Sequence, residues 1–165
     1  MKIYTKTGDR GETGLVNGQR VAKNQAVVEV LGAIDELNAT IGTLNLPLDK
    51  IQEDLMEIAA KIAGKKEDKG DRNLERKVKG LEREIDRMEK DLPKLTNFIL
   101  PAGPVHLARA VCRRAERRVV AMREAGDVRD PGETLRYLNR LSDYLFVLAR
   151  WENRRKKVPE KIWRR

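Results

Sequence analysis

The sequence contains one cysteine, Cys112, and one histidine, His106, and this shortage excludes several kinds of site. A lone cysteine cannot form an internal disulfide, which favours a reducing compartment. A zinc site needs several His or Cys ligands, and a ferritin-like di-iron site needs Glu-x-x-His pairs, which the sequence lacks. No set of serine, histidine and acid indicates a catalytic triad. We therefore expect no metal centre built from protein ligands, and we interpret His106 as a structural residue.

Long apolar runs and aromatic residues are also scarce. No stretch approaches the ~20 apolar residues that a membrane span needs, and the first residues lack the apolar core of a signal peptide. Aromatic residues make up 4% of the 165 residues and charged residues 37%. This composition is typical of long amphipathic helices rather than of a sheet sandwich. The sequence predicts a cytoplasmic protein of one all-α domain, with no membrane partner.

Basic residues outnumber acidic ones, 35 to 26, which gives a formal net charge of +9. This excess suits a polyanionic partner, whether nucleic acid, anionic lipid or the phosphates of a nucleotide. A solvated charged surface would give the same count. A nucleic-acid binder would show steeply salt-dependent affinity. Because no recognition motif for nucleic acid is present, we expect no such partner.

Apolar residues spaced by three and four predict five helices, and short connections between them predict a helical bundle. The predicted helices cover residues 26–46, 51–64, 74–92, 104–126 and 131–157. Asp130, Pro131 and Glu133 form a capping box at the start of the fifth. The charged segment after Gly64 is expected to be a loop. The bundle thus covers 26–157, after a separate N-terminal segment at 1–25.

The basic tail at 158–165 is broken by Pro159 and is expected to be either frayed or docked on the surface. Ile162 and Trp163 are its candidate anchors.

Glycine recurs at every third position in the N-terminal segment TKTGDRGETG, at Gly8, Gly11 and Gly14. This spacing matches neither the dinucleotide fingerprint nor the P-loop. Glycines nevertheless let backbone N–H groups approach a ligand, and hydroxyl and ammonium groups suit phosphate oxygens. The groups that the segment and its surroundings offer come from Thr5, Thr7, Thr13, Lys6 and Lys23. A plain hairpin turn on the surface is the alternative.

Arg109, Arg113 and Arg117 are spaced by four residues and therefore share one face of the fourth helix. Glu116 can offset part of their charge. Since the stripe lies beside apolar positions, we expect it to be partly buried, where an unpaired arginine is unfavourable. Guanidinium groups bind phosphates and carboxylates in bidentate fashion, so a triphosphate would fit. A solvated Arg/Glu face is the alternative.

Asp35 stands among the apolar positions of the first helix and therefore needs a partner. Arg109 or another arginine of the stripe could supply it, either within the chain or across a subunit interface. Asn139 and Asp143 form a second polar stripe on the fifth helix, which could also be a polar layer between helices.

Five blocks of the sequence, in order, resemble the ATP:cob(I)alamin adenosyltransferases of the kind that includes the human mitochondrial enzyme. They are YTKTGDRGETGL, EVLGAIDELNATIG, FILPAG, ARAVCRRAERRVV and YLNRLSDYLFVLAR. The resemblance spans nearly the whole chain. It implies a five-helix bundle with a glycine-rich N-terminal loop, assembled as a homotrimer with active sites between neighbouring subunits.

The resemblance also implies a role for individual residues. Arg113 would hold the phosphates of ATP, and Asp35 with Arg109 would bridge two subunits. Phe98 would press on the lower face of the corrin and exclude the axial ligand from cobalt, although the segment after it is shorter than usual in the family. The implied ATP ligands are Thr5, Lys6, Thr7, Gly8, Thr13, Gly14 and Lys23 from one subunit, with Arg113, Arg114, Ala115, Glu116, Arg117 and Asn139.

The implied reaction is displacement at the 5′ carbon of ATP by the reduced cobalt of cobalamin, with Mg²⁺ accompanying the phosphates. It gives adenosylcobalamin and triphosphate. The protein would orient the reactants and stabilise charge, without a side chain acting as acid or base. The alternative is an escort or regulatory module that binds ATP and cobalamin without turnover. A cobalamin reductase or an acceptor enzyme is a further possible partner.

Overall fold

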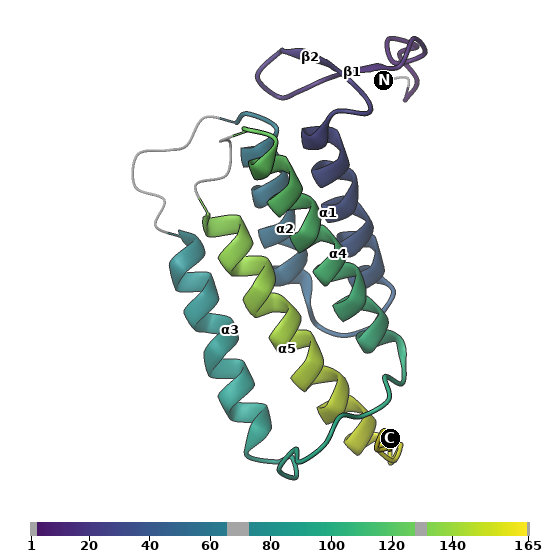
Figure 1. Cartoon of the computed structure of the whole chain (residues 1–165), viewed down its shortest axis with the longest axis vertical. Coiled ribbons are helices and arrows are strands. Elements are labelled where there is room, and N and C mark those ends of the chain that lie inside the picture. The colour runs from purple at the N-terminus through teal and green to yellow at the C-terminus, as the bar shows by residue number, and fades with distance from the viewer. Residues whose placement is uncertain (1–2, 66–72, 128–131, 165) are drawn as a thin grey trace.

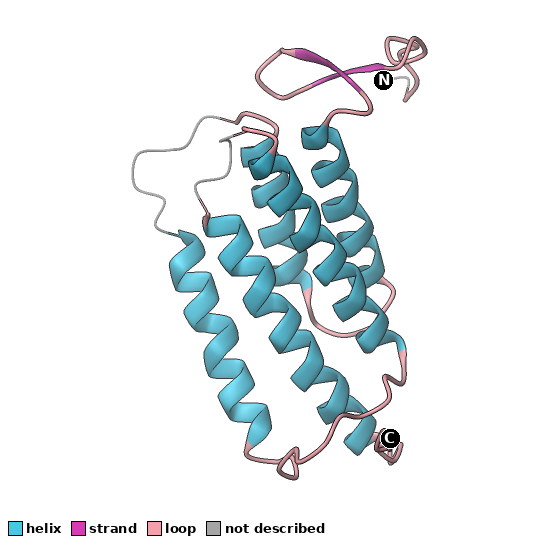
Figure 2. Cartoon of the chain, in the orientation of Figure 1, coloured by secondary structure: helices cyan, strands magenta, loops and turns pink. Residues whose placement is uncertain are grey.

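In the computed structural model, which describes residues 3–65, 73–127 and 132–164, five helices form a bundle with a small hairpin at one end (Figure 1). The chain contains β1 (Glu12–Gly14), β2 (Arg20–Ala22), α1 (Ala26–Gly42), α2 (Asp49–Ile62), α3 (Asn73–Glu89), α4 (Pro104–Glu124) and α5 (Glu133–Arg155). Figure 2 shows how small the strand content is beside the helices. The prediction of a helical bundle is confirmed. None of the helices described combines the length and the apolar character needed to cross a membrane.

Most helix boundaries agree with the prediction, and α4 begins at Pro104 as expected. Two helices end early. The first ends at Gly42, because Asn45 takes a left-handed backbone conformation (φ 52°) that a helix cannot continue through. The third ends at Glu89, and the following residues close a turn instead. The charged segment at 66–72 and the predicted cap residues 130 and 131 lie outside the described residues.

The N-terminal segment contains two short strands that the sequence analysis did not predict. They pair antiparallel, with Thr13 opposite Val21. Leu15 and Val21 are buried and belong to the main core, and the backbone N–H of Val16 donates to Ala63 O at 3.0 Å. The segment is therefore a hairpin tied to the end of α2, which agrees with the alternative of a hairpin turn.

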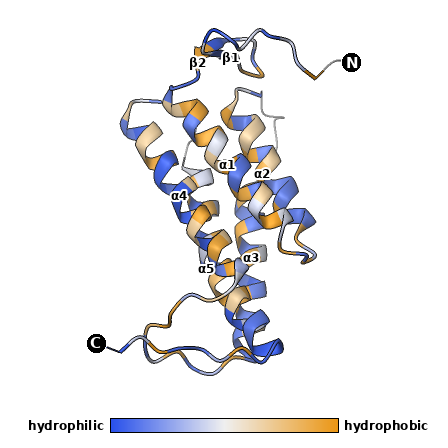
Figure 3. Cartoon of the chain, turned by 90° about the vertical axis from the view of Figure 1, so that its right-hand side faces the viewer, coloured by the Kyte–Doolittle hydropathy of each residue, from blue (hydrophilic) through white to orange (hydrophobic). Residues whose placement is uncertain are grey.

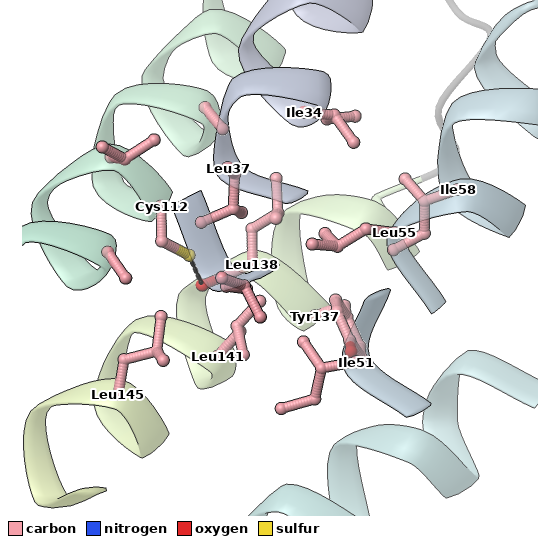
Figure 4. Packing of buried hydrophobic residues seen from close by; sticks show 14 of the residues in the cluster. Ile34, Leu37, Ile51, Leu55, Ile58, Cys112, Tyr137, Leu138, Leu141 and Leu145 are labelled. Atoms are coloured by element: carbon pink, nitrogen blue, oxygen red, sulfur yellow. Dashed lines mark hydrogen bonds between the residues drawn. The ribbon is translucent and has the colours of Figure 1, made fainter. Parts of the chain in front are cut away.

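The core lies between the amphipathic helices, along which hydrophobic and hydrophilic residues alternate (Figure 3). Within the bundle α5 packs on α3 and α4, while α1 packs on α2 and α4. Figure 4 shows Leu37, Leu55, Tyr137 and Leu138 meeting in the interior.

Cys112 donates from Sγ to Leu138 O at 3.3 Å, and burial raises the pKa of its thiol to about 12. Cys112 is thus a protonated core residue and not a nucleophile.

A polar network crosses the same core and joins α2, α3 and α5. The fully buried Tyr137 donates from Oη to Asp54 Oδ2 at 2.8 Å, and Lys77 Nζ lies 2.8 Å from Asp54 Oδ1. Lys77 also pairs with Glu57. Burial raises the pKa of Tyr137, so its hydroxyl stays a donor. Buried polar groups that are satisfied in this way fix how helices pack against one another.

Candidate functional site

The glycine-rich segment forms a tight turn that gathers hydroxyl and ammonium groups. Thr5 Oγ1 and Thr7 Oγ1 lie 2.9 Å apart. A Cβ atom on Gly8 would lie 3.2 Å from Lys23 Nζ, so glycine lets this lysine approach the backbone. Lys6 holds a left-handed backbone conformation (φ 59°), which is uncommon outside glycine. Thr5, Lys6, Thr7 and Lys23 are all exposed and open to a ligand.

Thr13 and Gly14 line a different feature, a shallow hollow that they share with Asp35 of α1. Leu31 and Gly32 of α1 form one wall of the hollow. No atom lies within 4 Å of the position that a Cβ atom on Gly32 would take. Asp35 is exposed here because its side of α1 is turned away from the core residues that α1 buries. Asp35 does lie beside apolar residues such as Leu31, but its exposure means that it needs no partner within the single chain.

The arginine stripe lies on α4 and partly lines a second hollow. Arg109 is half-buried, but Arg113 and Arg117 are exposed, so the expected partial burial of the whole stripe is wrong. Their side of α4 faces solvent in the single chain. Arg109 and Arg113 line the hollow together with Arg140 and Asp143 of α5.

Carboxylates of Glu89 and Asp143 also line this hollow, but Arg109 and Arg113 leave guanidinium groups that an anion can bind. Arg109 Nε is buried and has no hydrogen-bond partner among the described residues. Within the same part of the chain, Arg113 forms no ion pair, whereas its neighbours Arg114 and Arg118 pair with carboxylates of α1. The hollow therefore presents guanidinium groups of the kind that bind phosphates and carboxylates in bidentate fashion.

The remaining predicted ATP ligands point in different directions. Arg114 faces α1, where it pairs with Glu36, and Ala115 is fully buried in the core. Asn139 donates from Nδ2 to Glu116 Oε1 at 3.0 Å, which joins α4 and α5 beside the stripe. The structure thus brings Glu116 and Asn139 to the stripe but not the side chains of Arg114 and Ala115. The assignment of all four to a nucleotide site stays a prediction.

Asp35 and Arg109 do not meet within the chain. Asp35 lies in the hollow below the hairpin, and Arg109 lies in the hollow between α3, α4 and α5. No ion pair joins them among the described residues. The sequence left open whether Asp35 pairs with Arg109 within one chain or across a subunit interface. This structure excludes the pair within one chain.

Phe98 lies on the connection between α3 and α4, and 80% of its surface is exposed. The edge of the Trp163 ring approaches it at 6.4 Å between centroids, with an interplanar angle of 73°. The backbone N–H of Trp163 donates to Phe98 O at 2.9 Å, and Ile162 pairs with Ile99 across an isolated antiparallel bridge. The tail is therefore docked on the surface, and the predicted anchors are confirmed.

The predicted parts of the site lie far apart in one chain. Figure 1 shows the hairpin beyond the first turn of α1, whereas the connection to α4 and the C-terminus lie at the other end of the bundle. The 17 residues of α1 alone span about 25 Å at 1.5 Å per residue. A ligand shorter than this helix therefore cannot touch both the hairpin and Phe98 of one copy.

Several residues near the predicted site were not singled out from the sequence. Arg140 and Phe146 line the hollow of Arg113, and their spacing of three from Asp143 could have placed them on one face of α5. His106 is buried, with its ring centroid 5.8 Å from that of Phe146, as the structural interpretation predicts. Burial, together with the nearby charge of Arg109, lowers the pKa of His106.

Comparison with known proteins identifies relatives over the whole chain. The family model described as cobalamin adenosyltransferase matches residues 3–152. The corrinoid adenosyltransferase of Bacillus subtilis is 41% identical over 178 residues, which cover 97% of this chain and 91% of that protein. The corrinoid adenosyltransferase of Bos taurus is 38% identical over 186 residues, covering 99% of this chain and 76% of that protein.

A solved structure leads to the same family. It is a variant of the PduO-type ATP:corrinoid adenosyltransferase from Lactobacillus reuteri, complexed with cobalamin and ATP. The two folds agree with a TM-score of 0.89 at 32% sequence identity, and the match covers 99% of this chain and 100% of that one. The resemblance seen in the five sequence blocks is thereby confirmed, and the chain belongs to the cobalamin adenosyltransferase family.

Proposed function

We propose that this protein transfers the 5′-deoxyadenosyl group of ATP to the cobalt of cob(I)alamin, forming adenosylcobalamin and triphosphate. Membership of the family supports the reaction class. The observation that carries the proposal is the hollow in which Arg109 and Arg113, unlike Arg140 beside them, form no ion pair among the described residues. A triphosphate supplies the negative charge that this surface lacks.

The reaction needs no acid or base from the protein. The electron pair of the reduced cobalt forms a bond to the 5′ carbon of ATP, and the C5′–O bond breaks with its electrons leaving on triphosphate. The protein holds the reacting atoms in line and offsets the growing charge on the leaving group, which is the task of Arg113 and Lys6. The protonated Cys112 and the buried His106 take no part.

The hairpin closes over the phosphates in this proposal. Lys6 and Lys23 contribute charge, while Thr5 and Thr7 contribute hydroxyls next to the close approach at Gly8. The described residues contain no group of three or more His, Cys, Asp or Glu side chains that could hold a metal ion. Mg²⁺ would accordingly be held by the phosphate oxygens of ATP rather than by a protein cluster.

Phe98 has the task of excluding the axial ligand from cobalt on the lower face of the corrin. Its exposed ring offers an apolar surface to a flat macrocycle. Losing the lower ligand makes the cobalt easier to reduce, so this residue prepares the nucleophile rather than touching ATP.

A homotrimer with sites between subunits fits the separation of these parts. The hairpin of one subunit would meet the arginine stripe and Phe98 of its neighbour, and Asp35 would reach the neighbour's Arg109. Support comes from the exposed Asp35 and the buried, unpartnered Arg109 Nε of the single chain.

Asp35→Asn should then impair assembly and activity together. Analytical ultracentrifugation measures the assembly, and steady-state turnover measures the activity. A variant that remains trimeric and fully active would refute the pairing.

The function is tested by mixing the protein with anaerobically reduced cobalamin and Mg-ATP. We expect conversion of cobalamin, beyond one equivalent per site, to the light-sensitive adenosyl form. No conversion would refute the proposal, and conversion that stops at one equivalent would favour the escort module. We place the protein in the cytoplasm, where a reductase can supply cob(I)alamin.

A further inference from the structure

The connection that carries Phe98 is held from outside the bundle by the C-terminal tail. It runs from the end of α3 at Glu89 to the start of α4 at Pro104 without a helix of its own. Leu100 N donates to Lys161 O at 2.8 Å, and Trp163 N donates to Phe98 O at 2.9 Å. These two bonds hold the chain at Phe98 itself and two residues after it, so the tail forms the backbone support of that residue.

The tail is itself fixed to the bundle by Arg150 of α5, whose exposed fraction is only 4%. Arg150 Nε donates to Glu160 Oε1 at 2.6 Å, and Nη2 lies 3.3 Å from Glu160 Oε2. The same Nη2 donates to Pro93 O at 2.9 Å. One guanidinium group on a rigid helix thus holds both the first residues of the tail and the first residues of the Phe98 connection.

We propose that the Arg150–Glu160 pair is a clamp that positions Phe98 for its contact with the corrin. This inference rests on the proposed function, since the contact of Phe98 with the corrin is part of it. Arg150 is a positioning residue, because it acts through the tail and does not touch the substrate.

The physical reason lies in the exposure of the Phe98 ring. A side chain on an irregular connection has many conformations, and a residue that is 80% exposed gains little from packing within the chain. To keep an axial ligand away from cobalt, the ring must already stand in place before the corrin arrives. The contacts of Arg150 and the two backbone bonds provide that order. Arg150 holds the connection at Pro93, before Phe98, and the tail holds it at Phe98 and Leu100.

The test variant is Glu160→Gln, which weakens the clamp while leaving one acceptor for Arg150. We expect the amide protons of Leu100 and Trp163 to exchange with solvent at least roughly tenfold faster, because their acceptors lie across the tail contact. We also expect a smaller fraction of bound cob(II)alamin without its axial ligand, read from its electron paramagnetic resonance and absorption spectra. The KM for ATP should not change.

Glu133→Gln is the matched control. It breaks the ion pair between Lys61 and Glu133, which joins α2 to the opposite end of α5 with 3.1 Å between Nζ and Oε2. A general loss of stability would affect both variants alike. The clamp predicts that exchange at Leu100 and Trp163, and the axial-ligand spectrum, change only in Glu160→Gln.

Arg150→Lys is the second variant and keeps the buried charges balanced. An ammonium group cannot reproduce the planar fork that reaches Glu160 and Pro93 together, so both readouts should move in the same direction as in Glu160→Gln. Unchanged exchange in both variants would overturn the clamp. Faster exchange with an unchanged axial-ligand spectrum would overturn the link to Phe98. If the wild-type protein never removes the axial ligand, the assigned role of Phe98 fails instead, and the exchange experiment still tests the clamp.

Discussion

Replacing Arg113 by Ala should separate substrate binding from folding. Its guanidinium is exposed and forms no ion pair among the described residues, so truncation leaves no described carboxylate unpaired. Substitutions at such surface positions change the free energy of unfolding by about 0.5 kcal/mol or less. The backbone carbonyl that accepts a hydrogen bond from Arg117 Nη1 at 3.1 Å stays in place.

The effect on catalysis should be much larger. A hydrogen bond from a charged donor to a phosphate contributes about 1.5 to 3 kcal/mol. The loss of Arg113 should therefore lower kcat/KM for ATP by roughly 10- to 150-fold. If Arg113 binds the leaving triphosphate more tightly in the transition state than in the ground state, its loss lowers kcat. If it binds substrate and transition state equally, its loss raises only KM.

Steady-state kinetics under anaerobic conditions measure both parameters, and chemical denaturation measures stability. Arg83→Ala is the control, because Arg83 is an exposed arginine of α3 outside the candidate site. We expect normal kinetics for that variant. Normal kcat/KM for Arg113→Ala would refute the assignment of the phosphate contact, and an unfolded variant would refute the view that Arg113 has no structural role.

Three further changes test other parts of the account. Tyr137→Phe removes the hydroxyl that donates to the half-buried Asp54 and should lower the free energy of unfolding by about 1 to 3 kcal/mol. Denaturation curves that superimpose on the wild type would contradict this. Gly8→Ala places a Cβ atom 3.2 Å from Lys23 Nζ, so calorimetry should show weaker ATP binding with unchanged bundle stability, and unaltered affinity would count against the hairpin. Burial lowers the pKa of His106, so the folded protein resists a proton that the unfolded chain accepts. Stability should therefore be lost as pH falls below the ordinary value of 6.5, and His106→Gln should lose less over the same window; parallel pH profiles would contradict the assignment.

The helices could be predicted because their signals are local. Apolar spacing and Pro104 identify α4, and the stripe from Ile51 to Ile62 identifies α2. The end of α1 could not be predicted in the same way. Asn45 adopts a left-handed conformation there, but asparagine occurs in helices too, and the sequence alone does not decide between the two.

The site was predictable as a set of residue types but not as an arrangement. The spacing of four residues places Arg109 and Arg113 on one face of α4, yet it does not show that Arg113 is exposed. Burial depends on which helix packs against that face, and this is a long-range property. The contact of Arg150 with Glu160 was missed for a related reason. Arg150 belongs to the fifth helix and Glu160 to the basic tail, and only the docking of the tail brings them together.

The central claim is that one ATP lies between the hairpin of one subunit and the arginine stripe of the next, and mixed oligomers test it most directly. Lys6→Ala and Arg113→Ala chains, each expected to keep about a tenth or less of the wild-type kcat/KM alone, would be unfolded together and reassembled in equal amounts. If each site is shared between subunits, about a quarter of the sites combine two intact halves, and activity should recover to about that fraction. Activity that stays at the level of the separate variants would show that the hairpin and the stripe do not act on one ATP across an interface.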